Sequence, residues 1–251
     1  ELPWGLAGQV GYVATRSTRQ LNMLDINAGQ VIGAGAAGKP LQARFGRDAA
    51  TGELRPIGTG HYDSMQAQLQ RRFRVGLGLT VNYTWGKSIN FVDNSSNTPN
   101  IQALQYMNLN RSVSGFDRKH NFAVTNVWEL PFGKGKQWLS GGGAASAILG
   151  GWQVNSILSL ISGPPFTVSA DGTSLNLPGS SQQADQVGPV KKLGGIGASS
   201  PFYDQSSFAD VNQPRFGTSG FNILRAPGIG NWDFGVFREF SISERFKLQF
   251  R

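Results

Sequence analysis

The sequence predicts an all-β fold, a partial transmembrane antiparallel up-and-down β-barrel of the outer-membrane type with about seven strands and long extracellular loops. Three observations support this prediction. Apolar and polar residues alternate strictly in several segments, long and short connections alternate along the chain, and aromatic residues gather at the ends of the apolar strand faces. The mean hydropathy is -0.24, and no apolar run approaches the roughly 18 residues of a membrane helix, which excludes a helical membrane protein.

The clearest expected strand is the segment 75–86. Its odd positions, from Val75 to Trp85, are apolar, and its even positions are small or polar. A period of two residues predicts a β-strand with one face in an apolar medium and the other in a polar medium. The segment is longer than the roughly five or six residues of an average strand. It suits a tilted strand that crosses a membrane in roughly nine to eleven residues.

Less regular alternation predicts six further strands, at residues 6–15, 64–73, 117–131, 152–162, 232–240 and from 246 onward. The residues 144–149 could form one helical turn. The connections 16–60, 87–116 and 169–230 are long, whereas those after the second, fourth and sixth strands, such as 241–244, are short or moderate. Up-and-down barrels of the outer membrane have this asymmetry, with long loops outside the cell and short periplasmic turns.

The polar strand faces are rich in Gln, Asn, Ser, Thr and Gly, which suits a water-filled lumen. We expect the following side chains to face the lumen: Gln66, Gln68, Gln70, Thr80, Asn82, Thr84, Gln153 and Asn155. Aromatic rings prefer the headgroup level of a membrane. We therefore expect Tyr83, Trp85 and Trp232 at the outer interface, and Phe73, Trp128, Phe132, Trp152 and Phe240 at the periplasmic interface.

A soluble β-sandwich or barrel is the main alternative, because its strands also alternate, with the apolar face turned toward a core. Strand length, ring placement and loop asymmetry together favour the membrane interpretation. Seven strands with two open edges would leave edge N–H and C=O groups without partners in lipid. We therefore expect residues 1–251 to be a fragment of a larger barrel whose last strand or strands are truncated.

The chain carries a net charge of +8, but only 15% of its residues are charged, and the sequence has no long Lys or Arg block. We therefore expect outer-membrane lipid as a partner and no nucleic acid. The sequence has no Cys, so neither disulfides nor thiolate chemistry can occur.

The segment 33–38 satisfies the dinucleotide fingerprint G-x-G-x-x-G, and with Lys39 it imitates a phosphate loop. That motif needs a preceding strand and a following helix. Only two apolar residues precede it, and Pro40 stands where the magnesium-binding hydroxyl should be, so a loop of small residues is the better interpretation.

No residue pattern indicates catalysis or a metal site. Asp117 and His120 could suggest acid–base chemistry, but a hydrogen-bonded cluster at a strand entrance explains them better. His61 is the only other histidine, and the spacing of the two matches no metal-binding motif. We expect no enzyme, no cofactor and no metal.

The segment 83–88, Tyr-Thr-Trp-Gly-Lys-Ser, resembles the YTWSKS segment of TonB-dependent receptors of the Oar-like group. Further similar segments follow in the same order, at 116–120, 129–135, 149–153, 162–168, 222–228, 231–233 and 248–251. The resemblance covers most of the chain from about Tyr62 onward. Gly86 departs from the usual Ser of this group, and the AEFFNLFN-like sequence that usually follows is absent.

The resemblance implies a barrel of about twenty-two strands occluded by a plug domain. It implies energy-coupled uptake of an unknown extracellular ligand across the outer membrane of a Gram-negative-type bacterium. Contact with TonB would be made by an N-terminal segment outside this sequence. Residues 1–251 would then be part of the C-terminal barrel domain, without the plug and the N-terminal domain. An adhesion or recognition barrel and an open porin are the alternative functions.

Overall fold

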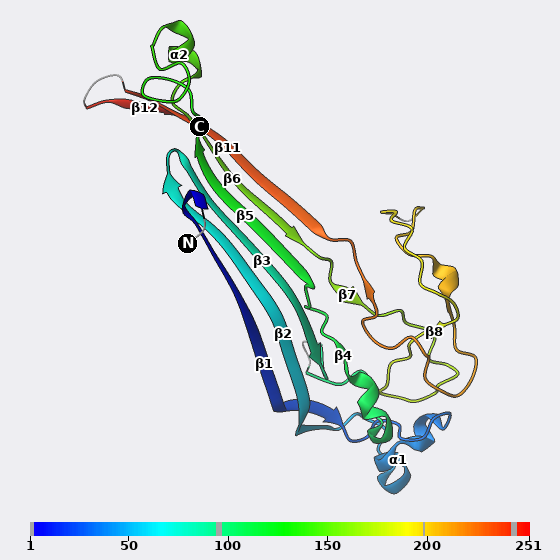
Figure 1. Ribbon diagram of the computed structural model, residues 1–251. Helices are drawn as coiled ribbons and strands as arrows, with labels where there is room; N and C mark the ends of the chain where they lie inside the picture. Colours follow the sequence, from blue (N-terminus) through cyan, green and yellow to red (C-terminus); the bar gives the residue numbers. More distant parts are fainter. Residues whose placement is uncertain (1–2, 94–96, 198, 242–244) are drawn as a thin grey trace.

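The computed structural model describes residues 3–93, 97–197, 199–241 and 245–251. Figure 1 shows one long, curved sheet with irregular loops gathered at one of its ends. The strands lie in the order β1-β2-β3-β5-β6-β11-β12, and the short β4 pairs beside β3. The long strands thus pair antiparallel with their neighbours in sequence, as in an up-and-down barrel. The predicted fold class is confirmed, with β1 and β12 at the edges of the described sheet.

The long strands are β1 (Leu6–Asp25), β2 (Gly52–Arg74), β3 (Leu77–Asn90), β5 (His120–Glu129), β6 (Trp152–Ile161), β11 (Ile229–Ser241) and β12 (Lys247–Phe250). The short strands are β4 (Ser112–Val113), β7 (Pro165–Phe166), β8 (Asp185–Gln186), β9 (Phe208–Ala209) and β10 (Leu224–Arg225). The helices are α1 (Pro40–Phe45), the predicted turn α2 (Ala144–Leu149) and the 3-10 helices Pro3–Gly5, Gly35–Gly38, Leu104–Asn110 and Gln205–Ser207. Residues 242–244 of the expected turn at 241–244 lie outside the described residues.

The first two strands extend well beyond their predicted bounds. β1 continues past Thr15 to Asp25, and β2 begins at Gly52, where the sequence predicts a loop. The pairing in this extension is interrupted by register shifts around Gln20. Alternation is lost here because neither face lies in an apolar medium, so the residues need not be sorted by polarity. The extension places the long loops far from the opposite end of the sheet (Figure 1).

The tight turn between β2 and β3 lies slightly later in the chain than predicted, at Val75 and Gly76. Val75 and Gly76 both have positive φ, of 54° and 78°. Two positive φ values at the centre of a two-residue loop are the signature of the hairpin turn that matches strand twist. These two residues therefore belong to the turn, and β3 begins at Leu77.

The pairing register separates the side chains of the sheet into one apolar and one polar face. One row of the apolar face runs Val10, Ala67, Tyr83, Phe122, Leu160 and Gly230. The adjacent row of the polar face runs Gln9, Gln68, Asn82, Ala123, Ser159 and Asn231. Across the paired strands, the alternating side chains therefore form two continuous surfaces, one apolar and one polar.

The hydrophobic core lies in the loops rather than under the sheet. The buried apolar residues are Leu24, Ala28, Ile101, Ala103, Leu175, Leu177, Ala184, Val211, Phe221 and Leu224. On the apolar face of the sheet, Val10, Tyr12 and Trp232 are 73%, 69% and 65% exposed. A soluble β-sandwich would bury this face, so the structure contradicts that alternative. None of the described helices has the length and apolar character needed to cross a membrane.

Candidate functional site

The eight predicted lumen residues share the polar face of the sheet. Six of them form cross-strand pairs between β2 and β3: Gln66 with Thr84, Gln68 with Asn82, and Gln70 with Thr80. Gln153 and Asn155 lie on β6, beyond the intervening β5. The structure therefore brings the six residues of β2 and β3 together. Gln153 and Asn155 lie on the same face, but two strands away from β3. That this face lines a lumen stays a prediction.

Side-chain amides on the polar face bond to one another, both across strands and within β6. The Gln68 amide donates to the Asn82 side-chain oxygen at 2.9 Å, and Gln9 on β1 donates to Gln68 at 3.3 Å. The Gln153 amide donates to the Asn155 side-chain oxygen at 2.8 Å. These bonds leave a neutral surface with further donors and acceptors, which suits contact with water or with a polar ligand.

The polar face is hollowed. A cavity of about 590 Å³ is lined by residues of β2, β3, β5, β6 and β11, among them Gln70, Thr80, Thr125, Asn155 and Asp233. A second, of about 340 Å³, lies over β1, β2 and β3. A hollow that spans several neighbouring strands requires the sheet to curve toward that face. Sequence reasoning missed Thr125 and Asp233, although Thr125 occupies a polar-face position of an expected strand.

The rings expected at the long-loop end lie on the apolar face. The Tyr83 hydroxyl lies 2.8 Å from Nδ1 of His120 on the neighbouring strand, and the two rings are stacked. Trp85 is opposite His120 in the register, and Trp232 packs edge-on against Phe234 with centroids 5.6 Å apart. These positions suit the outer interface, which stays a prediction.

At the opposite end, rings surround one arginine. The Arg238 guanidinium lies 5.3 Å from the Trp152 ring centroid and 4.3 Å from that of Phe240. Arg238 also donates to the Ile148 carbonyl at 2.7 Å, and the Trp152 indole donates to the same carbonyl at 2.9 Å. The cluster ties α2 to β6 and β11, a role that the sequence pattern does not reveal.

The other three predicted interface rings differ in setting. Trp128 is exposed on the apolar face of β5, and Phe132 packs against Trp138 in the following turn. Phe73 does not lie on the predicted face. A bulge between Arg71 and Arg74 changes the register, so that a Cβ built on Gly78 would lie 3.4 Å from Phe73 Cα and Cβ. Gly78 belongs to the polar face, so the bulge, which adds one residue, moves Phe73 off the apolar face. Its place at the periplasmic interface stays a prediction.

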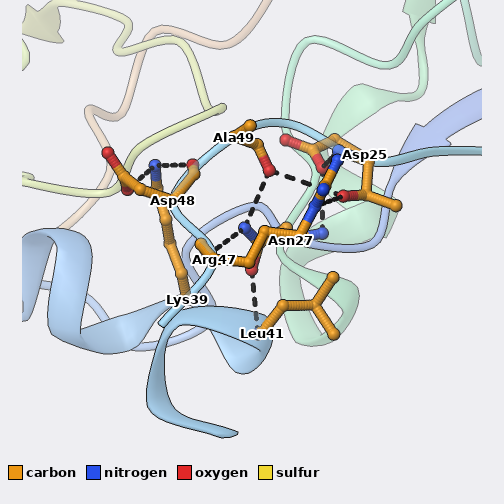
Figure 2. A network of polar contacts seen from close by, with 8 residues as sticks. Asp25, Asn27, Lys39, Leu41, Arg47, Asp48 and Ala49 are labelled. Carbon is orange, nitrogen blue, oxygen red and sulfur yellow. Dashed lines mark hydrogen bonds and ion pairs between the residues drawn. The ribbon is translucent and has the colours of Figure 1, made fainter. Parts of the chain in front are cut away.

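The long loops are held together by buried amide side chains. Asn27 is 0% exposed, and its side chain accepts from the Leu41 amide and donates to the carbonyls of Arg47 and Ala49, each at 2.9 Å (Figure 2). Its backbone N–H donates to Asp25 at 2.9 Å. One side chain thus joins the end of β1, helix α1 and the segment before β2. Such fully satisfied polar groups define one loop conformation.

A buried carboxylate joins β3 to the longest loop. Asp117, 1% exposed at its side chain, accepts from the Ser88 amide at 2.6 Å and pairs with Arg225. His120 has a different partner, Tyr83. The prediction of a hydrogen-bonded cluster at the strand entrance is confirmed for Asp117, and the two residues do not form an acid–base pair.

A second ion pair orders the outer part of the loop 162–228. Arg215 donates two hydrogen bonds to Asp185, at 2.7 and 2.6 Å, and the Thr218 amide donates to the same carboxylate at 3.1 Å. The hydrogen bonds from Arg215, aided by Thr218, hold the pKa of Asp185 below its usual value. The pair therefore stabilises β8 and the segment 215–218 only while the carboxyl is ionised.

The segment 33–39 lacks the geometry of a nucleotide site. No strand leads into it, and the Lys39 ammonium is bound to Asp48 at 2.6 Å. Contrary to expectation a helix does follow, at Pro40, but α1 has only 6 residues. Among the described residues, no three His, Asp or Glu side chains are grouped as metal ligands would be.

The open antiparallel sheet, its exposed apolar face and its hollowed polar face define the class of outer-membrane β-barrels. The chain belongs to the family described as outer membrane beta barrel domain, whose family model matches residues 1–251. No curated protein and no solved structure matches the chain. The protein is therefore located in the outer membrane. In this class of protein the long loops are typically on the extracellular side.

Proposed function

We propose that this domain is the barrel part of a TonB-dependent transporter that takes up a ligand from outside the cell. The observation that carries the proposal is the position of the buried core, which lies in the extracellular loops above a hollowed polar face. Loops with a core of their own can present a shaped surface to a ligand. The polar face would then line its path. The resemblance of the segment 83–88 to Oar-like receptors supports the same function.

Transport in this form requires parts beyond residues 1–251. The edge strands β1 and β12 would leave unpaired backbone groups in lipid, so we propose that further strands of a larger barrel pair with them. A plug would fill the lumen, and a segment outside this domain would contact TonB. The proposal includes no enzymatic step and no cofactor.

A recognition or adhesion barrel is the second candidate. The same packed loops favour a recognition function. Asn27, Asp117 and Asp185 each hold loop segments together, and these contacts do not depend on a lumen. Such a protein would bind its partner through the loops and move nothing across the membrane.

Two measurements on the purified full-length protein separate these functions. The first is binding to the purified periplasmic domain of TonB, and the second is ion conductance in a planar bilayer. A plugged transporter binds TonB and shows little steady conductance. Steady conductance without TonB binding would indicate an open porin, and the absence of both would indicate a recognition barrel.

A further inference from the structure

A further cavity lies apart from the two on the polar face. It has a volume of about 890 Å³ and lies where the middle of β1 and β2 and the end of β3 meet β4 and the segment 221–225. Its apolar lining includes Tyr12, Met65 and Trp85, and its basic lining includes Lys87, Arg111 and Lys119. The proposed transport function does not use it.

The pairing register places several strand side chains of this cavity on the apolar face, which we expect to contact lipid. Tyr12, Met65 and Trp85 lie opposite one another in one row of that face. Asp63 and Lys87 form the next row toward the loops. One row is two residues, or roughly 7 Å, further along the strands. Lys87 therefore lies just above the aromatic residues expected at the headgroup level.

The positive charge of the cavity is not neutralised by the protein. Asp63 already accepts from Arg16 at 2.7 Å and from the Tyr12 hydroxyl, and Asp117 pairs with Arg225. Over the described parts of the chain, no carboxylate forms an ion pair with any of the three basic side chains that remain, Lys87, Arg111 and Lys119. The Arg111 guanidinium lies 3.0 Å from Nδ1 of His61. The cavity thus combines an apolar floor with an uncompensated basic rim.

We propose that this cavity binds a phosphate-bearing glycolipid of the outer leaflet. Its phosphate groups would lie among Lys87, Arg111 and Lys119, as phosphorylated headgroups do in basic pockets at membrane surfaces. Its apolar part would lie against Tyr12, Met65 and Trp85, continuous with the lipid around the barrel. A soluble anion would gain nothing from this apolar floor. The proposal depends on the orientation of the domain in the membrane, not on transport.

The test is binding of lipid A to the purified full-length protein in detergent, measured by native mass spectrometry. We compare the wild type with Lys87→Gln/Lys119→Gln and with the matched control Lys134→Gln/Lys192→Gln, which removes the same charge outside the cavity. The proposal predicts that the cavity variant binds bisphosphorylated lipid A at least about tenfold more weakly. The control variant should bind as the wild type does. Arg111→Gln provides a second cavity variant.

Three outcomes would overturn the proposal. The first is equal binding by the wild type and both cavity variants, and the second is equal weakening in the control variant. The third is full displacement of the lipid by millimolar inorganic phosphate, which would indicate a site for a free anion. Heat-modifiable migration in gel electrophoresis verifies that each variant is folded. TonB binding by the same samples tests the proposed function separately.

Discussion

At the residue scale, the shape of the extracellular end depends on a few buried polar side chains. Asn27 uses its amide in three hydrogen bonds, and Asp117 bonds both a backbone amide and a guanidinium. Loops without regular structure have few backbone partners, so side chains must satisfy the buried donors and acceptors. Each such residue therefore fixes several loop segments at once.

Replacing Asn27 with Asp should destabilise the loops strongly, although the two side chains have the same shape. The carboxylate cannot donate to the carbonyls of Arg47 and Ala49, and it places a charge in a fully buried site. We expect a loss of about 2–4 kcal/mol in the free energy of unfolding. Thermal denaturation of the full-length protein in detergent measures it. The control Asp48→Asn, in an exposed pair with Lys39, should cost about 0–1 kcal/mol.

Gly163 should tolerate no larger side chain. A Cβ at this position would overlap the backbone carbonyl of Ala226, which cannot move without displacing β10. At Gly188, in the same loop, a Cβ would meet no atom within 4 Å. Gly163→Ala should therefore make the loop 162–228 susceptible to protease on intact cells, and Gly188→Ala should not. Equal protection of both variants would show that the chain path at Gly163 is wrong.

At the element scale, the sequence predicts the strands where one face meets lipid and fails where neither face does. Trp152–Ile161 agrees closely with its predicted range, because an apolar medium on one side enforces alternation. The strand predicted at 75–86 is also present, but it runs from Leu77 to Asn90, into the residues predicted as a loop. The outer halves of β1 and β2 lack that constraint and were missed. The bulge before Arg74 also escapes pattern analysis, because an added residue is visible only when the pairing is known.

The candidate site, too, is only partly predictable from the sequence. The eight polar-face residues follow from parity alone, whereas the cavity at Lys87 and Arg111 depends on the contact of β4 with β3. The loop that connects β3 to β4 makes this contact possible, and no local sequence pattern predicts the course of that loop. The sequence contains the basic residues but does not indicate that they line one cavity.

The ion pair between Asp185 and Arg215 should make the outer part of the longest loop sensitive to acid. Because the pKa of Asp185 is lowered in the folded state, its contribution is fully present above the usual carboxyl range. It is lost as the pH falls below the usual carboxyl range and through the lowered folded-state pKa. Hydrogen–deuterium exchange, corrected for intrinsic rates, should show loss of protection around 185–186 and 215–218 in this range. Asp185→Asn should have reduced protection at pH 6 and no such pH dependence.

At the scale of the whole molecule, the domain exposes an apolar sheet face and two sheet edges. Both features are favourable only in a membrane with partner strands. Residues 1–251 expressed alone should therefore aggregate in water and stay dispersed in detergent. Sedimentation velocity in the two conditions measures this. A monodisperse, folded chain in water would contradict the membrane assignment of the apolar face.

The central claim is that the apolar face contacts lipid and the polar face contacts water. The chain has no Cys, so single cysteines at 79–84 on β3 can each be labelled uniquely within this domain. The decisive measurement is the accessibility of spin labels at these six positions in proteoliposomes of the full-length protein. Labels at Leu79, Val81 and Tyr83 should be relaxed by oxygen dissolved in lipid, and those at Thr80, Asn82 and Thr84 by a water-soluble nickel complex. The reverse pattern, or no alternation, would contradict the account.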